Sequence, residues 1–383
     1  MNWTVISKYS LVAFSAVVSV AVPVLVISRL GLNEDSDQFF FISAIAGSYA
    51  AVTNTFLKAK YYSKLIDRIG GGYSLSIDSL ALIALLNASL FVFGSVSSQD
   101  LFLEIYIYCS FFCFYSYSLT YSMATDHVRS FEISDIIGQL ISVFILLLFP
   151  ITSVSEILLA VSSRYLPNIF RQFGVCYRQG LDHTGYVSTP LYATRTIFSS
   201  ILHKNNGVVD RMLLASIDTG AITIYSIWEI AANLYVRICN RTKILNVIND
   251  SLQTAEIDGR KIFRLGGLAI LIWLCGVNLF SPVAYYVVSS NQINDLIVIS
   301  MYSSGFILSQ LLVAIYLQFL YKFKIDKGVN FLIALLYLIF WAIKYSLSDY
   351  GYIGLAALNS CLGLFTIAIV IYIYNISIKE FRN

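Results

Sequence analysis

Long apolar stretches are the feature that most constrains this chain. Segments of about 20 mostly apolar residues, the length that an α-helix needs to cross a bilayer, recur along the whole sequence. In lipid every backbone N–H and C=O must be bonded within the protein, so such a stretch adopts a helix. With 58% hydrophobic and only 12% charged residues, the composition excludes an ordinary soluble domain. We therefore expect an all-α integral membrane protein.

The sequence contains twelve such stretches. They cover residues 9–30, 39–57, 80–96, 101–122, 136–151 and 154–173, and then 191–217, 221–238, 265–288, 296–321, 329–345 and 352–374. The polar segment after the sixth stretch predicts two lobes of six transmembrane helices, residues 1–178 and 179–383. Near the start of each lobe, a tight polar turn around Gly31 or Gly220 separates two helices, as in transporters with duplicated halves.

Basic residues between the stretches support this assignment and predict an orientation. Cytoplasmic loops of membrane proteins are rich in Lys and Arg, and alternate loops of this chain hold most of its basic residues. The seventh stretch, residues 191–217, is polar for a span. If it did not cross, however, the basic loops of the second half would lie outside. We therefore expect it to cross, shielded from lipid, and both termini to be cytoplasmic.

Four cationic side chains lie inside the predicted spans: Arg164, Arg195, Lys204 and Arg211. Each charge near the bilayer centre opposes insertion by roughly 2.5 to 3.5 kcal/mol, so these residues should face a polar lumen. We expect a central cationic cavity and an anionic cargo. Lys204 and Arg211 are seven residues apart and share a helix face, and a guanidinium with an ammonium suits a pyrophosphate group.

Pairing within the protein is the alternative role for these cations. Arg211 can pair with Glu229 of the next span, and Asp210 can pair with Lys204. Asp210 and Glu229 are also the carboxylates well inside the spans, where a buried carboxylate can couple transport to protons or sodium. The sequence leaves both interpretations open.

The remaining cations near the membrane have weaker indications of a role. Arg164 lies three residues before Pro167, where a proline kink frees backbone carbonyls that a guanidinium can satisfy, so a structural role is as well supported as cargo contact. Arg195 is predicted at the cytoplasmic mouth. Arg29 and Lys344 are predicted near the outer side.

Other kinds of site are not indicated. The six cysteines are scattered without a C-x-x-C pair or a histidine at ligand spacing, so no metal site is predicted. The glycines at residues 70–72 lack the neighbours of a phosphate-binding loop. We expect no cofactor. The outer loops have no polar cluster that could support catalysis, so we expect no enzyme, and the basic amphipathic segment at residues 240–261 should contact anionic lipid headgroups.

Two parts of the sequence resemble a known family. They are VPVLVISRLGLNEDSDQFFF, residues 22–41, and GVVDRMLLASIDTGAITIYSIWEIAANLY, residues 207–235, which is followed by basic NRTKILNVINDS. These resemble the first hairpin and the start of the second lobe in polysaccharide flippases of the multidrug/oligosaccharidyl-lipid/polysaccharide (MOP) exporter superfamily. Twelve spans with both ends inside also match its architecture.

The resemblance implies a Wzx-type O-antigen flippase. Such a protein moves undecaprenyl-pyrophosphate-linked oligosaccharide repeat units, used for lipopolysaccharide or a similar surface polysaccharide, from the cytoplasmic to the periplasmic leaflet of the cell inner membrane. It implies lumen cations at Lys204, Arg211 and Arg195, whereas Arg164 rests on the physical argument alone. The implied partners are the lipid-linked oligosaccharide, membrane lipids, and a polysaccharide polymerase with its chain-length machinery, but no nucleic acid.

Two other functions are compatible with the sequence. One is an ion-coupled exporter of small solutes or drugs from the same superfamily, for which Glu229 and Asp210 would be the cation sites. The other is a membrane enzyme such as an O-antigen polymerase, which would need a catalytic loop. The positive charge expected in the lumen favours the flippase, because it suits an anionic cargo.

Overall fold

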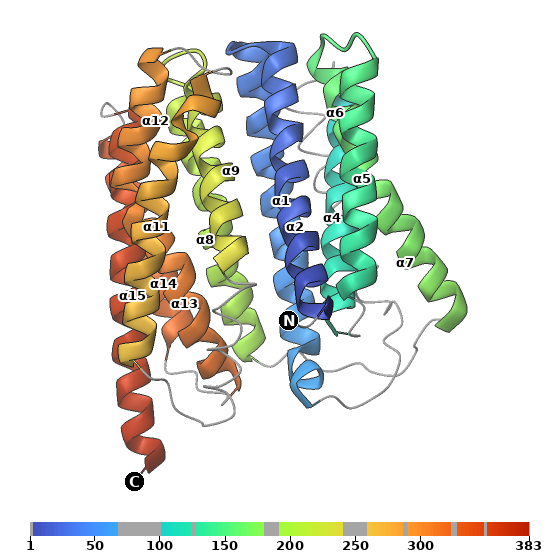
Figure 1. Cartoon of the computed structure of the whole chain (residues 1–383). Coiled ribbons are helices and arrows are strands. Elements are labelled where there is room, and N and C mark those ends of the chain that lie inside the picture. Colours follow the sequence, from blue (N-terminus) through green and yellow to red (C-terminus); the bar gives the residue numbers. More distant parts are fainter. Residues whose placement is uncertain are drawn as a thin grey trace. The chain divides into compact units, whose positions relative to one another are not determined.

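The computed structural model consists of helices and the turns that join them. It describes residues 3–67, 101–124, 128–179, 191–239, 259–285, 290–322, 328–347 and 351–382, and these residues contain no strand. The chain divides into two compact units (Figure 1). We call residues 17–208 the N-terminal unit, and residues 1–16 together with 209–383 the C-terminal unit. The lobe boundary predicted after residue 178 remains a prediction.

The first part of the chain contains long helices. They are α1 (Trp3–Leu30), α2 (Glu34–Asp67), α4 (Phe102–Ala124), α5 (Val128–Leu148), α6 (Val154–Ser162), the short 3-10 helix η1 (Ser163–Tyr165), α7 (Leu166–Gln179) and α8 (Leu191–Leu214). The division between the units falls within α1 and within α8. Each of these two helices therefore contributes residues to both units.

The rest of the C-terminal unit is also helical. Its helices are α9 (Ala221–Cys239), α11 (Gly259–Tyr285), α12 (Ser290–Tyr302), α13 (Ser304–Lys322), α14 (Val329–Ser346) and α15 (Gly351–Arg382). The predicted spans that fall in the described residues are confirmed as helices or, at residues 154–173 and 296–321, as interrupted helices. The predicted span at residues 80–96 lies outside the described residues, as does the amphipathic segment up to residue 258.

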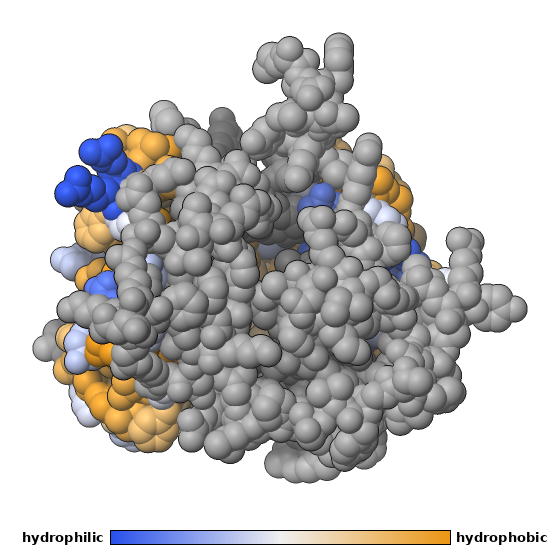
Figure 2. Space-filling model, turned by 90° about the horizontal axis from the view of Figure 1, so that it is seen from below, coloured by the Kyte–Doolittle hydropathy of each residue, from blue (hydrophilic) through white to orange (hydrophobic). Residues whose placement is uncertain are grey.

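Judged by length and composition alone, four helices in the described residues are long and apolar enough to cross a membrane. The spans are Phe102–Leu119, Ser130–Leu148, Val329–Ser346 and Gly351–Ser377. Helices α12 and α13 form a fifth candidate, bent by 43° at Ser303. Large apolar side chains such as Leu148 and Phe331 are exposed, and orange side chains appear along the outer edges of Figure 2. Such surfaces suit contact with lipid.

A cluster of aromatic rings packs between α4, α5 and η1 in the N-terminal unit. Tyr165 stacks on Phe112 with ring centroids 5.2 Å apart and lies 5.1 Å from the ring of Tyr115. Beside it, α5 approaches the backbone of η1 closely, because a Cβ added to Gly138 would lie 1.8 Å from the carbonyl oxygen of Arg164. Only glycine fits at that contact.

Small residues bring α13 and α15 together in the C-terminal unit. A Cβ on Gly363 would lie 2.7 Å from the Ser309 hydroxyl, and one on Gly305 would lie 3.0 Å from Ser360. Glycine and serine let helix backbones approach closely inside membranes, where lipid competes equally for apolar side chains. The Ser360 hydroxyl also donates a hydrogen bond to the carbonyl of Tyr302, which the bend between α12 and α13 frees.

The two polar turns noted in the sequence have the same backbone feature. Gly31, between α1 and α2, has φ +81°, and Gly220, between α8 and α9, has φ +87°. Glycine adopts this left-handed conformation without steric cost, which explains its use at both helix ends. After the first turn, the Asn33 side chain accepts hydrogen bonds from the backbone N–H groups of Asp35 and Ser36 and so caps α2.

Candidate functional site

The end of α8 places two charged residues side by side within the C-terminal unit. Asp210 and Arg211 are consecutive, so their side chains leave the helix about 100° apart and meet different neighbours. The turn at Gly220 returns the chain as α9, on which Tyr225 and Glu229 lie one turn apart. The hairpin of α8 and α9 thus provides two carboxylates, a guanidinium and a phenol.

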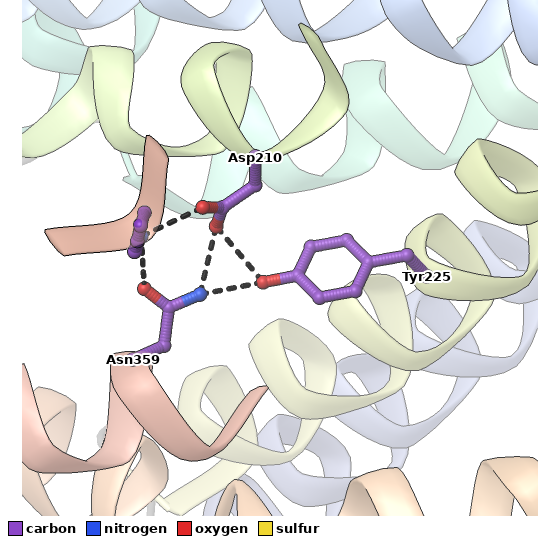
Figure 3. Close-up of polar contacts among 4 residues, drawn as sticks. Asp210, Tyr225 and Asn359 are labelled. Atoms are coloured by element: carbon purple, nitrogen blue, oxygen red, sulfur yellow. Dashed lines mark hydrogen bonds and ion pairs between the residues drawn. The ribbon is translucent and has the colours of Figure 1, made fainter. Parts of the chain in front are cut away.

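Asp210 lies at the centre of a fully connected polar network. Its Oδ1 accepts a hydrogen bond from the Nζ of Lys344 at 2.6 Å. Its Oδ2 accepts hydrogen bonds from the hydroxyl of Tyr225 at 2.9 Å and from the amide of Asn359 at 2.7 Å. Figure 3 shows Asp210, Tyr225 and Asn359 pointing toward one another. Helices α8, α9, α14 and α15 each contribute one of the four side chains.

The other atoms of this network bond to one another as well. Lys344 Nζ donates to Asn359 Oδ1 at 2.6 Å, and Asn359 Nδ2 donates to the Tyr225 hydroxyl at 2.6 Å. Asp210 is 1% exposed, Lys344 0% and Asn359 2%. Lys344 also lies in the last turn of α14, where the helix dipole favours a cation. The buried ion pair is therefore satisfied on both sides, as an ion pair away from water must be.

Arg211 forms the second ion pair of this hairpin. Its Nη2 donates to Glu229 Oε2 at 2.6 Å, and the two side chains are 7% and 24% exposed. The Arg211–Glu229 pairing considered from the sequence is thus present. In it, the charge of a predicted lumen cation is neutralised by that of a predicted coupling carboxylate. Asp210 pairs with Lys344. The pairing with Lys204 considered from the sequence lies outside the described side chains. The two pairs leave this cluster with no net charge.

Lys344 is the partner of Asp210 that the sequence did not indicate. Its predicted position near the outer side stays a prediction, and it lies buried in the last turn of α14. A lysine in a stretch as apolar as residues 329–345 was the available signal, because such a charge requires a partner within the protein. Asn359 and Tyr225 carried no comparable signal, since asparagine and tyrosine occur throughout the spans.

Arg164 lies in the N-terminal unit, in the short helix η1. Its guanidinium carbon is 5.2 Å from the centre of the Tyr165 ring, and it interacts electrostatically with Asp135 of α5. Its Nε is buried without a hydrogen-bond partner among the described residues. An unsatisfied guanidinium N–H is costly inside a protein and indicates a place where a further acceptor can bind.

Arg164 does not bond to the backbone carbonyls near Pro167, which was the structural role considered from the sequence. Pro167 cannot donate to the carbonyl of Ser163, and the N–H of Leu166 bonds to this carbonyl instead. This is the shorter bond of a 3-10 turn and explains why η1 interrupts the α-helix. Ser162 and Ser163 donate their hydroxyls to the carbonyls of Leu158 and Ala160. No hydrogen bond from Arg164 to these carbonyls is present.

A second arginine, Arg171, follows on α7. Arg171 donates through Nη2 to the hydroxyls of Ser118 and Ser122 on α4, and its guanidinium lies 5.7 Å from the ring centre of Phe131. Between the two arginines, the buried amide of Asn168 has neither its Nδ2 nor its Oδ1 hydrogen-bonded among the described residues. Arg171 thus holds α7 against α4.

The other two predicted lumen cations lie on α8, but their side chains are outside the described part of the structure. Lys204 directly precedes Asn205 on this helix, and Asn205 Oδ1 accepts a hydrogen bond of 2.5 Å from Ser48 on α2. The helix is continuous through Asn205 and Asn206 as far as Leu214. Among the described residues, no group of His, Cys, Asp or Glu could hold a metal ion.

Comparison with solved structures identifies the fold. The lipid II flippase MurJ, in an inward closed conformation, has a TM-score of 0.72 and 13% identity over 95% of this chain and 87% of its own. The chain has the fold of this flippase. A MATE protein in its straight conformation has a TM-score of 0.60 at 15% identity, covering 97% and 94% of the two chains. An inward-facing multidrug resistance MATE transporter of the MOP superfamily has a TM-score of 0.58 at 12% identity, covering 98% and 95%.

These similarities establish the architecture of the chain. No family model matches the sequence, and no curated protein matches it. At identities of 12–15%, the solved structures support the fold and nothing finer. Together with the apolar helices, they show an all-α integral membrane protein, and the described helices are consistent with about twelve spans. The predicted fold class is confirmed, while the cationic cavity and the orientation of the termini remain predictions.

Proposed function

We propose that this protein is a MOP-superfamily flippase for a lipid-linked oligosaccharide. The cargo would be an oligosaccharide repeat unit on undecaprenyl pyrophosphate, moved from the cytoplasmic to the periplasmic leaflet of the inner membrane. The observation that carries the proposal is the similarity to the lipid II flippase, with a TM-score of 0.72 over 95% of this chain. The MATE structures named above have scores of 0.58 and 0.60.

The charges of the N-terminal unit support an anionic cargo. Arg164 has a buried Nε that lacks a hydrogen-bond partner among the described residues. Arg171 follows seven residues later, about two helical turns along the same interrupted helix. Guanidinium groups suit phosphate oxygens because their N–H groups form a planar fork. Lys204 and Arg195 on α8 would add to this charge. Arg211 is a weaker candidate for direct cargo contact, because Glu229 already binds it.

Transport can be tested with purified protein in proteoliposomes that contain undecaprenyl-pyrophosphate-linked oligosaccharide. A membrane-impermeant reagent that oxidises sugars would report the fraction of cargo exposed on the outer leaflet. We expect the wild type to raise the accessible fraction well above that of one leaflet. We expect Arg164→Ala to slow this exchange about tenfold or more, since one charge-assisted contact contributes roughly 1.5–3 kcal/mol.

The matched control is Arg264→Ala, which removes an exposed arginine from the start of α11. It should exchange cargo at the wild-type rate. Accessibility equal to that of protein-free liposomes, with folded wild-type protein present, would exclude the flippase. Equal rates for Arg164→Ala and Arg264→Ala would exclude a role of Arg164 in cargo binding.

An ion-coupled exporter of small solutes is the second candidate. The MATE structures favour it, because this chain covers 94% and 95% of their lengths. The two carboxylates expected to couple such transport are, however, already bound to side-chain cations, Asp210 to Lys344 and Glu229 to Arg211. Export of a cationic dye from proteoliposomes, driven by a proton or sodium gradient, would favour this candidate over the flippase.

A further inference from the structure

The surroundings of the Lys344 ammonium are those of a small cation site. Its Nζ lies 2.6 Å from Asp210 Oδ1 and 2.6 Å from Asn359 Oδ1, which are a carboxylate oxygen and an amide carbonyl oxygen. These are the oxygen types that proteins use for hard cations. The ammonium carries a single positive charge, as Na⁺ and K⁺ do.

The residues that carry these oxygen atoms are also joined by hydrogen bonds that do not involve the ammonium. The Asn359 amide donates to Asp210 Oδ2 at 2.7 Å and to the Tyr225 hydroxyl at 2.6 Å, and the Tyr225 hydroxyl donates to the same Oδ2 at 2.9 Å. These bonds direct Asn359 Oδ1 and Asp210 Oδ1 toward the same point. These groups come from α8, α9 and α15, whereas the lysine comes from α14.

We propose that the oxygens of Asp210 and Asn359, oriented by Tyr225, form a monovalent-cation site whose resident cation is the ε-ammonium of Lys344. The cation of this site is thus tethered to the chain. In the wild type the ammonium occupies this site, so Na⁺ and K⁺ should not bind there. Shortening Lys344 to alanine would leave a buried carboxylate without its counter-ion and a space beside it, and a metal cation with water would then fill the site.

The test is the thermal unfolding of purified protein in detergent, in NaCl, KCl or N-methyl-D-glucamine chloride at equal ionic strength. A ligand that binds only the folded protein raises Tm as its concentration exceeds Kd. We expect Lys344→Ala to have a Tm about 3 °C or more higher in NaCl or KCl than in N-methyl-D-glucamine chloride. The wild type should have the same Tm in all three salts. The double variant Asp210→Asn with Lys344→Ala should also show no difference, because it lacks the carboxylate.

Several results would overturn the proposal. One is an equal Tm of Lys344→Ala in the three salts. Another is a Tm of the wild type that is higher in NaCl or KCl than in N-methyl-D-glucamine chloride, with no such difference in Asp210→Asn. If Lys344→Ala does not accumulate in any salt while the double variant does, the carboxylate cannot recruit a metal cation, and the proposal is wrong. If neither accumulates, Lys344→Ser is compared in the three salts, and a flat response again contradicts the proposal. The readout is cation binding, so it does not depend on the identity of the cargo.

Discussion

Individual residues decide the electrostatics of this protein. The described part of the C-terminal unit buries two opposite charges in the Asp210–Lys344 pair and places a second pair, Arg211 with Glu229, beside it. Removing one partner from a buried pair leaves an uncompensated charge, whereas removing both is often nearly neutral. The two pairs can therefore be separated from cargo binding by comparing single with double substitutions.

For the first pair, Lys344→Met should destabilise the protein by about 3–5 kcal/mol, because methionine fills the space and leaves the Asp210 carboxylate unpaired. The double variant Asp210→Asn with Lys344→Met should recover most of this loss, since no charge remains. Thermal unfolding in detergent without added metal salts measures both. Additive losses in the double variant would mean that the two side chains do not interact in the membrane protein.

For the second pair, the sequence predicts that replacing Lys204 and Arg211 together by alanine abolishes delivery of cargo to the outer leaflet. The Glu229 contact allows a sharper comparison. If Arg211 only pairs with Glu229, Arg211→Gln should slow exchange and Arg211→Gln with Glu229→Gln should restore it, both measured in proteoliposomes. A double variant that stays as slow as Arg211→Gln would instead indicate that Arg211 contacts the cargo.

At the scale of helices, close backbone contacts require particular small residues. On α5, Gly138 packs against the carbonyl of Arg164, where an added Cβ would lie 1.8 Å from the oxygen. Gly138→Ala should therefore push α5 away from η1 and cost about 1–3 kcal/mol or more, which thermal unfolding would detect.

The control for this contact is Gly174→Ala on α7, since a Cβ at Gly174 meets nothing within 4 Å. Alanine favours a helix over glycine, so the control should unfold at the wild-type temperature or slightly above. Equal unfolding temperatures for the two variants would show that α5 and η1 can separate without cost.

Helices were predictable from the sequence to the extent that their cause is local. The apolar length of residues 329–345 and 352–374 predicts α14 and α15 without knowledge of any other segment. The Arg211–Glu229 pair could be considered from the sequence because two consecutive antiparallel spans place residues near their shared turn side by side. Asp210 and Lys344 are 134 residues apart, and no periodicity relates them. Their contact depends on which helices pack together, which the sequence pattern does not contain.

At the scale of the whole molecule, the distribution of basic residues still predicts the orientation. Cytoplasmic termini require an even number of crossings, and residues 191–217 must then cross despite their charges. Alkaline phosphatase, which is active only outside the cytoplasm, should be inactive when fused after Arg382 and active when fused after Asp218. Activity at both fusion points would contradict the predicted topology. An immunoblot of each fusion protein shows that an inactive fusion is present in the cells.

The pairing of Asp210 with Lys344 also has a consequence for how the protein is made. Asp210 leaves the ribosome 134 residues before its partner, which corresponds to about 7–27 s at a synthesis rate of about 5–20 residues per second. During that interval the carboxylate has only the hydroxyl of Tyr225, on the following helix, as a partner from the completed network. The eighth predicted span can therefore assist the seventh at the translocon, but the seventh acquires its counter-ion only when the eleventh arrives.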